Sequence, residues 1–435
     1  MSALYNAASR KIDALLEFYF TSEPVSITND DFLISFNLLE ELGSDAEANP
    51  IGDVSANELD IVLYNKDGIF SPANVNSPYY GLMRSGVKVI AKLRPAPNAE
   101  WDEVGTFYVS DWYAEVTGMQ ASVTCFDKLY DALNSSPPIL PVINTVTYAD
   151  AFASYMQALG FKYTLDSTLS GDMSWWYTLS EASETLRKLA SASMAAVFCD
   201  HYDNIRILNL ASAKEVSSTL TDSDQIIAAT VPQSINRSYS GLDISIYNTQ
   251  LSDSRQLMDL KDHMFPPGNS TTGLMQFSTR PVVRVECVVA DSTSNAIELV
   301  GFQSTPDALQ FKTHNRGVSN TPMSVAVYGR AIEAVKSTYY HYGNNPLMYD
   351  NVYTQLSAAA ERTSRMLDRF VRSALPHLKL SIRGNPKLNL GDKITVKSAR
   401  YNLLFTGILQ RANYTYNGAL RCDINLVDSL ILEVN

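Results

Sequence analysis

The sequence lacks the patterns that mark most secreted, membrane-bound and metal-binding proteins. Its four cysteines are scattered, with no Cys-x-x-Cys pair, so we expect a reduced protein without disulfides or a zinc site. No basic-then-apolar stretch opens the chain, and no apolar run approaches the roughly 18 residues that a membrane helix needs. We therefore expect a chain with no membrane segment of its own, made and folded in a cytoplasm.

The motifs of common enzymes are also missing. There is no Gly-x-Ser-x-Gly elbow and no glycine-rich phosphate loop ahead of a Lys-Ser or Lys-Thr pair. The five histidines are far apart and form no paired zinc motif. Cys199, Asp200 and His201 are all ligand types, but neighbouring strand residues point to opposite faces, which favours a simple hairpin turn. The sequence thus predicts no catalytic residues, no cofactor and no metal.

Basic charge is scarce. The chain has 34 Lys and Arg against 46 Asp and Glu, a net charge of −12. A dedicated nucleic-acid binder needs a basic stripe, so that class is disfavoured, whereas a channel through which DNA merely passes is not. With 46% hydrophobic and 18% charged residues, the chain is globular. Its 435 residues suggest roughly three or four domains.

What the sequence does contain is a distinctive stretch from Leu380 to Val396. Two short alternating segments predict strands with one buried face each. Between them, a glycine that permits positive φ and a proline without an N–H group interrupt any ladder, and a second Gly-Asp turn precedes the next strand. Such a pattern is typical of a small β-barrel turning a corner. The candidate structural residues of these turns are Gly384, Asn385, Pro386, Gly391 and Asp392.

The first third of the chain has the same character. Residues 12–130 show short apolar–polar alternations cut by turns such as 65–68, which predicts roughly six or seven antiparallel strands. The proline-rich segment 135–141 has the composition of a stiff linker and predicts a domain boundary. After it the period becomes helical, with Thr147 and Asp150 as a helix start and Gly160 as its end. Residues 142–212 therefore predict a small α+β unit of helix, strand, helix and hairpin.

The second half predicts more strands, a Gly/Pro-rich loop at 266–273, and a loop with five tyrosines at 339–353. A helix over 356–371 follows, with apolar residues on one face. Its arginines are spaced by 3, 4 and 3 residues and form a stripe on the other face. This stripe is either solvated or a contact with an acidic neighbouring subunit. Its members are Arg362, Arg365, Arg369 and Arg372.

The segment Gly-Asn-Pro-x-Leu-x-x-Gly-Asp-x-Ile-x-Val at 384–396 resembles the second-barrel motif of baseplate-hub proteins in tailed phages and contractile injection systems. It also resembles the hub portion of tail-associated lysins. Residues 55–61, 107–112 and 124–130, the last with Asp127-Lys128-Leu129-Tyr130, are similar to the first hub barrel. The resemblance covers essentially the whole chain.

The resemblance implies an α+β, predominantly β fold. It consists of two small antiparallel β-barrel domains, an α+β insert domain and a further domain inserted in the second barrel. The implied boundaries are 1–136 for the first barrel and 137–227 for the linker and α+β insert. The second barrel would combine 228–250 with 373–435, and 251–372 would be the inserted domain ending in the long helix.

The same resemblance implies a structural role in the virion tail, assembled in the host cytoplasm. The chain would be a homotrimer whose paired barrels form a pseudo-sixfold ring joining the tail tube or distal tail protein to a central spike or tip protein. DNA would pass in transit, and the tape measure protein is a further candidate partner. Since no segment follows the second barrel, a cell-wall hydrolase would be another polypeptide. Three alternatives remain open: a hexameric distal-tail protein, a host-binding module that uses the 339–353 loop on glycans, and a cell-wall hydrolase.

Overall fold

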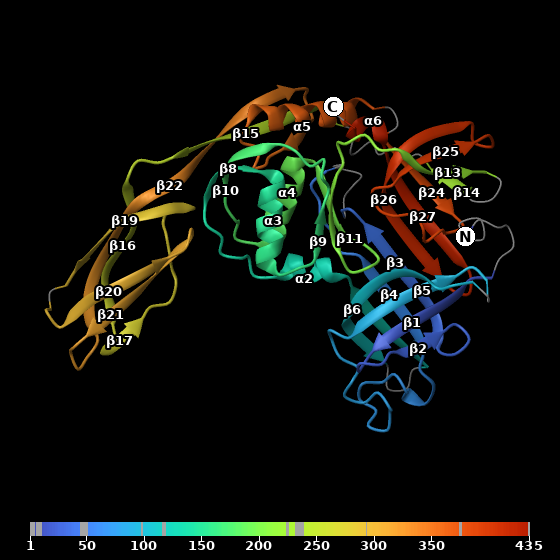
Figure 1. The fold of residues 1–435 in the computed structure, drawn as a ribbon, viewed down its shortest axis with the longest axis horizontal. Helices are drawn as coiled ribbons and strands as arrows, with labels where there is room; N and C mark the ends of the chain where they lie inside the picture. Colours follow the sequence, from blue (N-terminus) through green and yellow to red (C-terminus); the bar gives the residue numbers. More distant parts are fainter. Residues whose placement is uncertain are drawn as a thin grey trace.

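The computed structural model describes residues 5, 11–43, 51–96, 99–114, 119–222, 226–230, 239–292, 294–373 and 376–433. This part of the chain forms an arch (Figure 1): N-terminal and C-terminal strands build one leg, a helical unit lies at the centre, and a long β arm forms the other leg. Strands far outnumber helices, which confirms the predicted predominantly β class. Within the described ranges, no helix has the length and apolar character needed to cross a membrane.

The first leg begins with seven antiparallel strands in the order β3-β4-β7-β6-β5-β1-β2. They form where apolar and polar residues alternate: Ala14, Leu16 and Phe18 are fully buried, while Glu17 and Tyr19 keep contact with solvent. The predicted 65–68 turn contains a short 3₁₀ helix, η1 (Lys66–Gly68). The strands are β1 (Asp13–Tyr19), β2 (Val25–Thr28), β3 (Leu33–Glu41), β4 (Glu58–Tyr64), β5 (Lys88–Arg94), β6 (Asp102–Ala114) and β7 (Gln120–Phe126).

C-terminal strands continue this sheet. β26 (Leu403–Tyr416) pairs antiparallel with β3, and the register places Tyr416 opposite Phe36. In the described part of the chain, 13 strands form one sheet, and one hydrophobic cluster contains residues of both regions, from Ile12 to Leu426. The two predicted barrel regions therefore share a sheet and a core. The other elements of this region are β13 (Val216–Thr221), β14 (Ile226–Thr230), β24 (His377–Ile382), β25 (Lys393–Ser398), β27 (Leu420–Asp428) and α6 (Ser429–Leu432).

The second β region was predicted to combine residues 228–250 with the C-terminal strands. The segment that pairs with those strands is a different one. β13 pairs with β25 and β14 pairs with β24, so residues 216–230 supply it. β15 (Gly241–Leu251), which covers most of the predicted piece, pairs instead with β22 (Thr321–Tyr342) and β23 (Pro346–Tyr349). The reason is packing: Leu242 and Ile244 of β15 are fully buried in a cluster with the apolar face of α5 (Ser357–Arg372).

The central unit contains the predicted helices and hairpin. α3 (Tyr148–Leu159) begins where the Thr147 hydroxyl accepts the Asp150 N–H at 3.0 Å and ends at Gly160, whose φ is +77°. Both predicted ends of this helix are confirmed. A pairing that was not predicted joins β8 (Ile143–Thr147) to β10 (Asp172–Trp176). The remaining elements are α2 (Lys128–Asn134), β9 (Tyr163–Leu165), α4 (Ala182–Ser193), β11 (Ala195–Cys199) and β12 (Ile205–Asn209).

The arm is built around β22, a strand of 22 residues. β16 (Arg255–Phe265) and β19 (Val282–Asp291) flank its first half, and β15 pairs with its second half. A second small sheet contains β17 (Gly268–Thr271), β18 (Met275–Gln276), β20 (Ile297–Ser304) and β21 (Ala308–Asn315). Together the two sheets enclose a separate core that includes Leu257, Phe311 and Val327.

Two predicted loops in this region are wrong. In the tyrosine-rich segment 339–353, residues 339–342 belong to β22 and 346–349 to β23, while 343–345 and 350–353 lie outside strands. Tyrosine favours strands, and Tyr339 and Tyr340, 37% and 41% exposed, are strand residues. The segment 266–273 contains β17, which pairs with β21. The host-binding hypothesis placed its glycan contacts on this segment as a loop, and part of the segment is strand instead.

Candidate functional site

The predicted turn between β24 and β25 is fastened to the shared sheet. Gly384 has a φ of +77°, a conformation that glycine adopts without steric cost. Asn385 and Pro386 are buried. The Asn385 carbonyl accepts the Tyr414 hydroxyl of β26 at 3.1 Å. This first half of the turn therefore docks onto the strand that joins the two β regions.

The second half of the turn bonds to the same strand. Gly391, with a φ of +80°, donates its N–H to the Leu409 carbonyl at 2.8 Å, and the Leu409 N–H donates to the Asp392 carbonyl at 2.8 Å. The Asp392 carboxylate accepts the Asn389 N–H at 3.0 Å. Burial raises the pKa of Asp392, although its hydrogen bonds and Lys214 oppose this change. All five predicted turn residues thus lie in one hydrogen-bonded corner.

Replacing Gly391 with valine is expected to lower the free energy of unfolding by about 1–3 kcal/mol. A Cβ at this position would have an unfavourable positive φ and would lie 2.4 Å from Cδ2 of Leu208. Because the β regions share a core, we expect both to lose stability together. Gly273→Val, where a Cβ meets nothing within 4 Å, is the control. Chemical denaturation measures the stability of both variants. A denaturation midpoint of Gly391→Val equal to that of the parent would contradict the expected backbone strain at this position.

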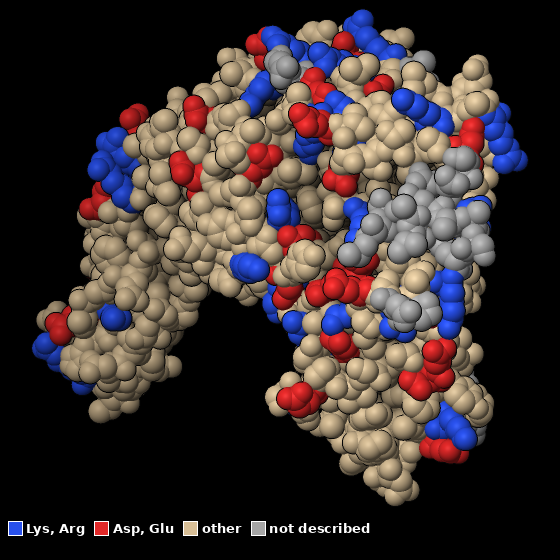
Figure 2. Space-filling view, turned by 45° about the vertical axis from the view of Figure 1, so that its right-hand side comes forward, with Lys and Arg blue, Asp and Glu red and all other residues tan. Residues whose placement is uncertain are grey.

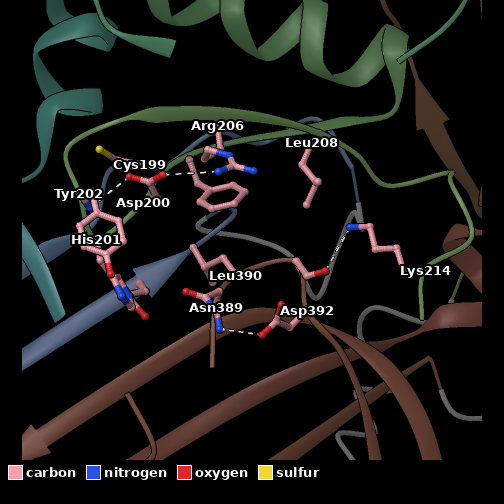
Figure 3. Close-up of a pocket in the computed structure, with 13 residues that line it drawn as sticks. Cys199, Asp200, His201, Tyr202, Arg206, Leu208, Lys214, Asn389, Leu390 and Asp392 are labelled. Carbon is pink, nitrogen blue, oxygen red and sulfur yellow. Dashed lines mark hydrogen bonds and ion pairs between the residues drawn. The ribbon is translucent and has the colours of Figure 1, made fainter. Parts of the chain in front are cut away.

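A cavity of about 410 Å³ lies beside this corner. Figure 3 shows its wall: Asp200, Tyr202 and Arg206 come from the β11–β12 hairpin, and Asp392 lies across the cavity from them. The Asp200 carboxylate is 3.7 Å from the Arg206 guanidinium. Lys214 donates to the Gly391 carbonyl at 3.1 Å, and burial lowers the pKa of Lys214 to about 8. Side chains of both charge signs therefore line this cavity.

The tip of the β11–β12 hairpin is clamped to the first β region. His201 Nε2 lies 2.8 Å from Oε1 of Glu40 on β3, and both side chains are largely buried. Burial alone would lower the pKa of His201, but the Glu40 carboxylate, with smaller contributions from Asp200 and Glu103, raises it above its usual value. The contact between His201 and Glu40 therefore holds the hairpin against β3, and it is an ion pair when His201 is protonated.

A second group of contacts reinforces this clamp. The Asn57 side chain donates to the Cys199 carbonyl at 3.1 Å, and the Tyr108 hydroxyl donates to the Asp203 carboxylate at 2.6 Å. Asp127, 3% exposed, accepts the backbone N–H of Asn57 at 2.9 Å. Burial nevertheless raises the pKa of Asp127 to about 7, because its hydrogen bonds offset only part of the desolvation. The joint between the central unit and the first leg is thus polar, buried and sensitive to protonation.

This joint is built for positioning. Across the described ranges, no group of three or more His, Cys, Asp or Glu side chains is arranged to hold a metal ion. His201 bonds to Glu40 rather than sharing a site with Cys199. Burial raises the pKa of the Cys199 thiol, which disfavours the reactive thiolate. What the arrangement does is fix the angle between the central unit and the β leg.

The predicted arginine stripe on α5 contacts its own chain. Two arginines form ion pairs one helical turn back along α5, and the other two donate to backbone carbonyls elsewhere. The partners are Ser170 for Arg362, Glu361 for Arg365, Leu430 and Glu433 for Arg369, and Asp368 for Arg372. The stripe thus ties α5 to the central unit and to the segment after β27, and its role between subunits stays a prediction.

Comparison with known proteins agrees with this architecture along the whole chain. No family model and no curated protein matches the sequence. Among solved structures, the 43 kDa tail protein of prophage MuSo2 from Shewanella oneidensis matches with a TM-score of 0.55 and 13% identity, covering 98% of this chain and 100% of that one. The chain has the fold of phage tail proteins. A tail protein from Neisseria meningitidis MC58 matches with a TM-score of 0.53 and 8% identity, covering 97% and 98%. The predicted resemblance to tail proteins is thereby confirmed at the level of the fold.

Proposed function

We propose that this phage tail-fold chain is a structural subunit of the hub at the tail tip or baseplate. Three copies would form a ring that joins the tail tube to the central spike or tip and lets DNA pass. The observation that carries this proposal is the match to a prophage tail protein over 98% of the chain. A match of that extent involves the arm and the central unit as well as the β leg.

The shared sheet supports the ring geometry. Each chain brings two β regions that are held at a fixed relation by the β3–β26 pairing. Three chains would supply six such regions, the number that meets a sixfold tail tube. The clamp formed by His201 and Glu40 would hold the central unit outside the ring at a constant angle. The proposed function is therefore geometric, and it needs rigid joints rather than a catalytic site.

The net charge of −12 fits a wall past which DNA moves without being held, because like charges repel the phosphates. In this proposal the partners are further copies of the chain, the tail tube or distal tail protein and the central spike or tip protein, with the tape measure protein as a further candidate. The location is the virion tail, after assembly in the host cytoplasm.

The oligomeric state tests this function. Light scattering of the purified chain should give three times the 48.1 kDa mass of one chain at concentrations where assembly is complete. A sixfold mass would favour the distal-tail alternative, and a twofold mass would contradict the hub. A contact between two different surfaces of the chain closes only as a ring. The mass of the closed assembly therefore gives the number of copies in that ring.

A further inference from the structure

The connection between β4 and β5 forms a protrusion at the free end of the first leg (Figure 1). Its residues 68–83 include no charged side chain. Asn65, 1% exposed, donates its amide to the Ser71 hydroxyl at 2.9 Å and accepts the Phe70 N–H at 2.8 Å. The indole N–H of Trp112 on β6 donates to the Phe70 carbonyl at 2.9 Å. The protrusion is therefore held in one conformation on the leg, which reduces the entropy that is lost when it docks on a partner.

An exposed turn at 74–77 carries part of the apolar surface of this protrusion. The Asn76 N–H donates to the side-chain oxygen of Asn74 at 3.0 Å, which fixes the turn. Val75 is 67% exposed and Tyr80 is 52% exposed, and Asn76 is exposed as well. Figure 2 shows no charged side chain at the lowest point of this leg. The protrusion thus presents an aliphatic side chain, an aromatic ring and an amide on a rigid support, a combination typical of protein interfaces.

A hollow of about 530 Å³ lies between the arm and the central unit. Ile139, on the segment before β8, and Leu274, on the segment before β18, line it and are 65% and 60% exposed. Arg280 and Asp307 of the arm give its described lining one basic and one acidic side chain, so neither sign is in excess. The lining also includes four prolines, which have no N–H group to donate: Pro137, Pro138, Pro281 and Pro306.

Two hydroxyl groups of this hollow are available to an occupant. Tyr177 and Thr178 line the hollow and are only 6% and 8% exposed. Within the described part of the chain, neither side-chain hydroxyl forms a hydrogen bond. A largely buried hydroxyl group without a protein partner costs free energy. An occupant that offers backbone or amide groups would remove this cost.

The protrusion has the chemistry that this hollow requires. Its exposed valine and tyrosine side chains match the exposed apolar side chains of the hollow, and burying both sets together is favourable. The Asn76 amide and the backbone of the turn can bond to the two hydroxyl groups. Within one chain, the protrusion lies at the free end of one leg and the hollow at the inner end of the other (Figure 1). A protrusion that fills the hollow therefore has to come from another copy.

We propose that the 74–77 turn of one copy docks in the hollow between the arm and the central unit of the next copy. This inference rests on the proposed hub function and names two surfaces that would join its subunits. Because the two surfaces are different, the contact is heterologous and closes only as a ring. The occupant of the hollow is thus a second copy of this chain.

Cross-linking between two single-cysteine variants tests the docking directly. Cys287 is the exposed cysteine of the parent, so every protein in this test also carries Cys287→Ser. Val75→Cys and Leu274→Cys proteins, mixed as monomers and then concentrated, should give covalent dimers with a short bis-maleimide. Each variant alone should stay a single chain on a denaturing gel.

The control mixture contains Val75→Cys and Val318→Cys, which places the second thiol at a fully exposed position elsewhere on the arm. It should give no covalent dimer. A mixture of Val75→Cys and Leu274→Cys without a product would overturn the docking. So would dimers of Val75→Cys alone, because they would place two protrusions against each other.

A charge placed on the turn provides an independent test. Val75→Lys should raise the protein concentration at which half of the chains are assembled by about tenfold or more, because docking would bury the lysine charge. The melting temperature of the monomer should stay unchanged, since Val75 is 67% exposed. Val318→Lys should assemble like the parent. Equal assembly of Val75→Lys and the parent would contradict the docking.

The outcomes separate this inference from the hub itself. A parent trimer, with no product from the mixed Val75→Cys and Leu274→Cys proteins and with unchanged assembly of Val75→Lys, would overturn the docking and leave the trimeric hub standing. A parent that stays monomeric at every concentration would overturn both. A covalent dimer in the mixture together with weakened assembly of Val75→Lys is the expected combination.

Discussion

Replacing Tyr416 with alanine is expected to lower the free energy of unfolding by about 3–5 kcal/mol, the range for removing a large buried aromatic side chain. Tyr416 is 1% exposed and its ring stacks on Phe36 with centroids 5.3 Å apart, at the point where β26 meets β3. Its hydroxyl donates to the Ile12 carbonyl at 3.0 Å. The side chain therefore joins the two β regions, and both should unfold at lower denaturant concentration.

Tyr416→Phe is the matched control for this prediction. It keeps the ring and removes the hydroxyl, so it should cost about 1 kcal/mol. Leu404→Ala, at a residue that is 74% exposed in the same strand, should cost almost nothing. Denaturant titration followed by tryptophan fluorescence measures all three. A Tyr416→Ala protein within about 1 kcal/mol of the parent would mean that the β regions do not depend on this joint.

The second large effect is a loss of stability as the pH rises. The pKa of Asp127 is about 7 in the folded protein and lies near its ordinary value of about 4 in the unfolded chain. The folded state therefore keeps a proton that the unfolded state has lost, and the stabilisation decreases as pH increases toward 7. Between pH 5 and pH 7.5 the decrease is on the order of 2 kcal/mol. The raised pKa of His201 acts in the same direction above about pH 6.5, since its ion pair with Glu40 is lost upon deprotonation.

Asp127→Asn tests the cause. Asparagine cannot ionise. Its one side-chain oxygen can keep only one of the two hydrogen bonds that the Asp127 carboxylate accepts at 2.9 Å each, from the Asn57 N–H at Oδ2 and from the Leu129 N–H at Oδ1, so the variant should be less stable than the parent at pH 5. The melting temperature of this variant should therefore fall less between pH 5 and pH 7.5 than that of the parent. Calorimetry at several pH values gives the comparison. Parallel curves for the two proteins would remove Asp127 from the explanation.

Much of the β leg and of the corner at 384–392 could be predicted from the sequence because both depend on local signals. Alternating apolar residues such as Leu16 and Phe18 predict a strand without knowledge of its partner. Gly384 and Gly391 stand where the backbone needs positive φ. The ends of α3 follow from Thr147 and Gly160. Each of these features is encoded within a few residues.

The remaining features depend on contacts between distant residues. β22 could not be recognised as one strand because its tyrosines continue into the Gly-Asn-Asn-Pro turn, which suggested a loop over the whole segment. The pairing of β15 with β22 and β23 depends on α5, more than 100 residues away in sequence. His201 and Glu40 are separated by 161 residues. Neither residue belongs to a motif, so the clamp becomes visible only in the folded chain.

The most direct test of the central claim is an electron-microscopy reconstruction of the assembled tail tip. The proposed hub function predicts a threefold ring around an open channel, with residues 12–130 and 378–435 of every copy lining the channel and residues 142–212 at the periphery. The β3–β26 pairing should place the two β regions of each copy side by side around the ring. A twofold dimer, or a ring in which only one of the two β regions faces the channel, would contradict the proposed hub function.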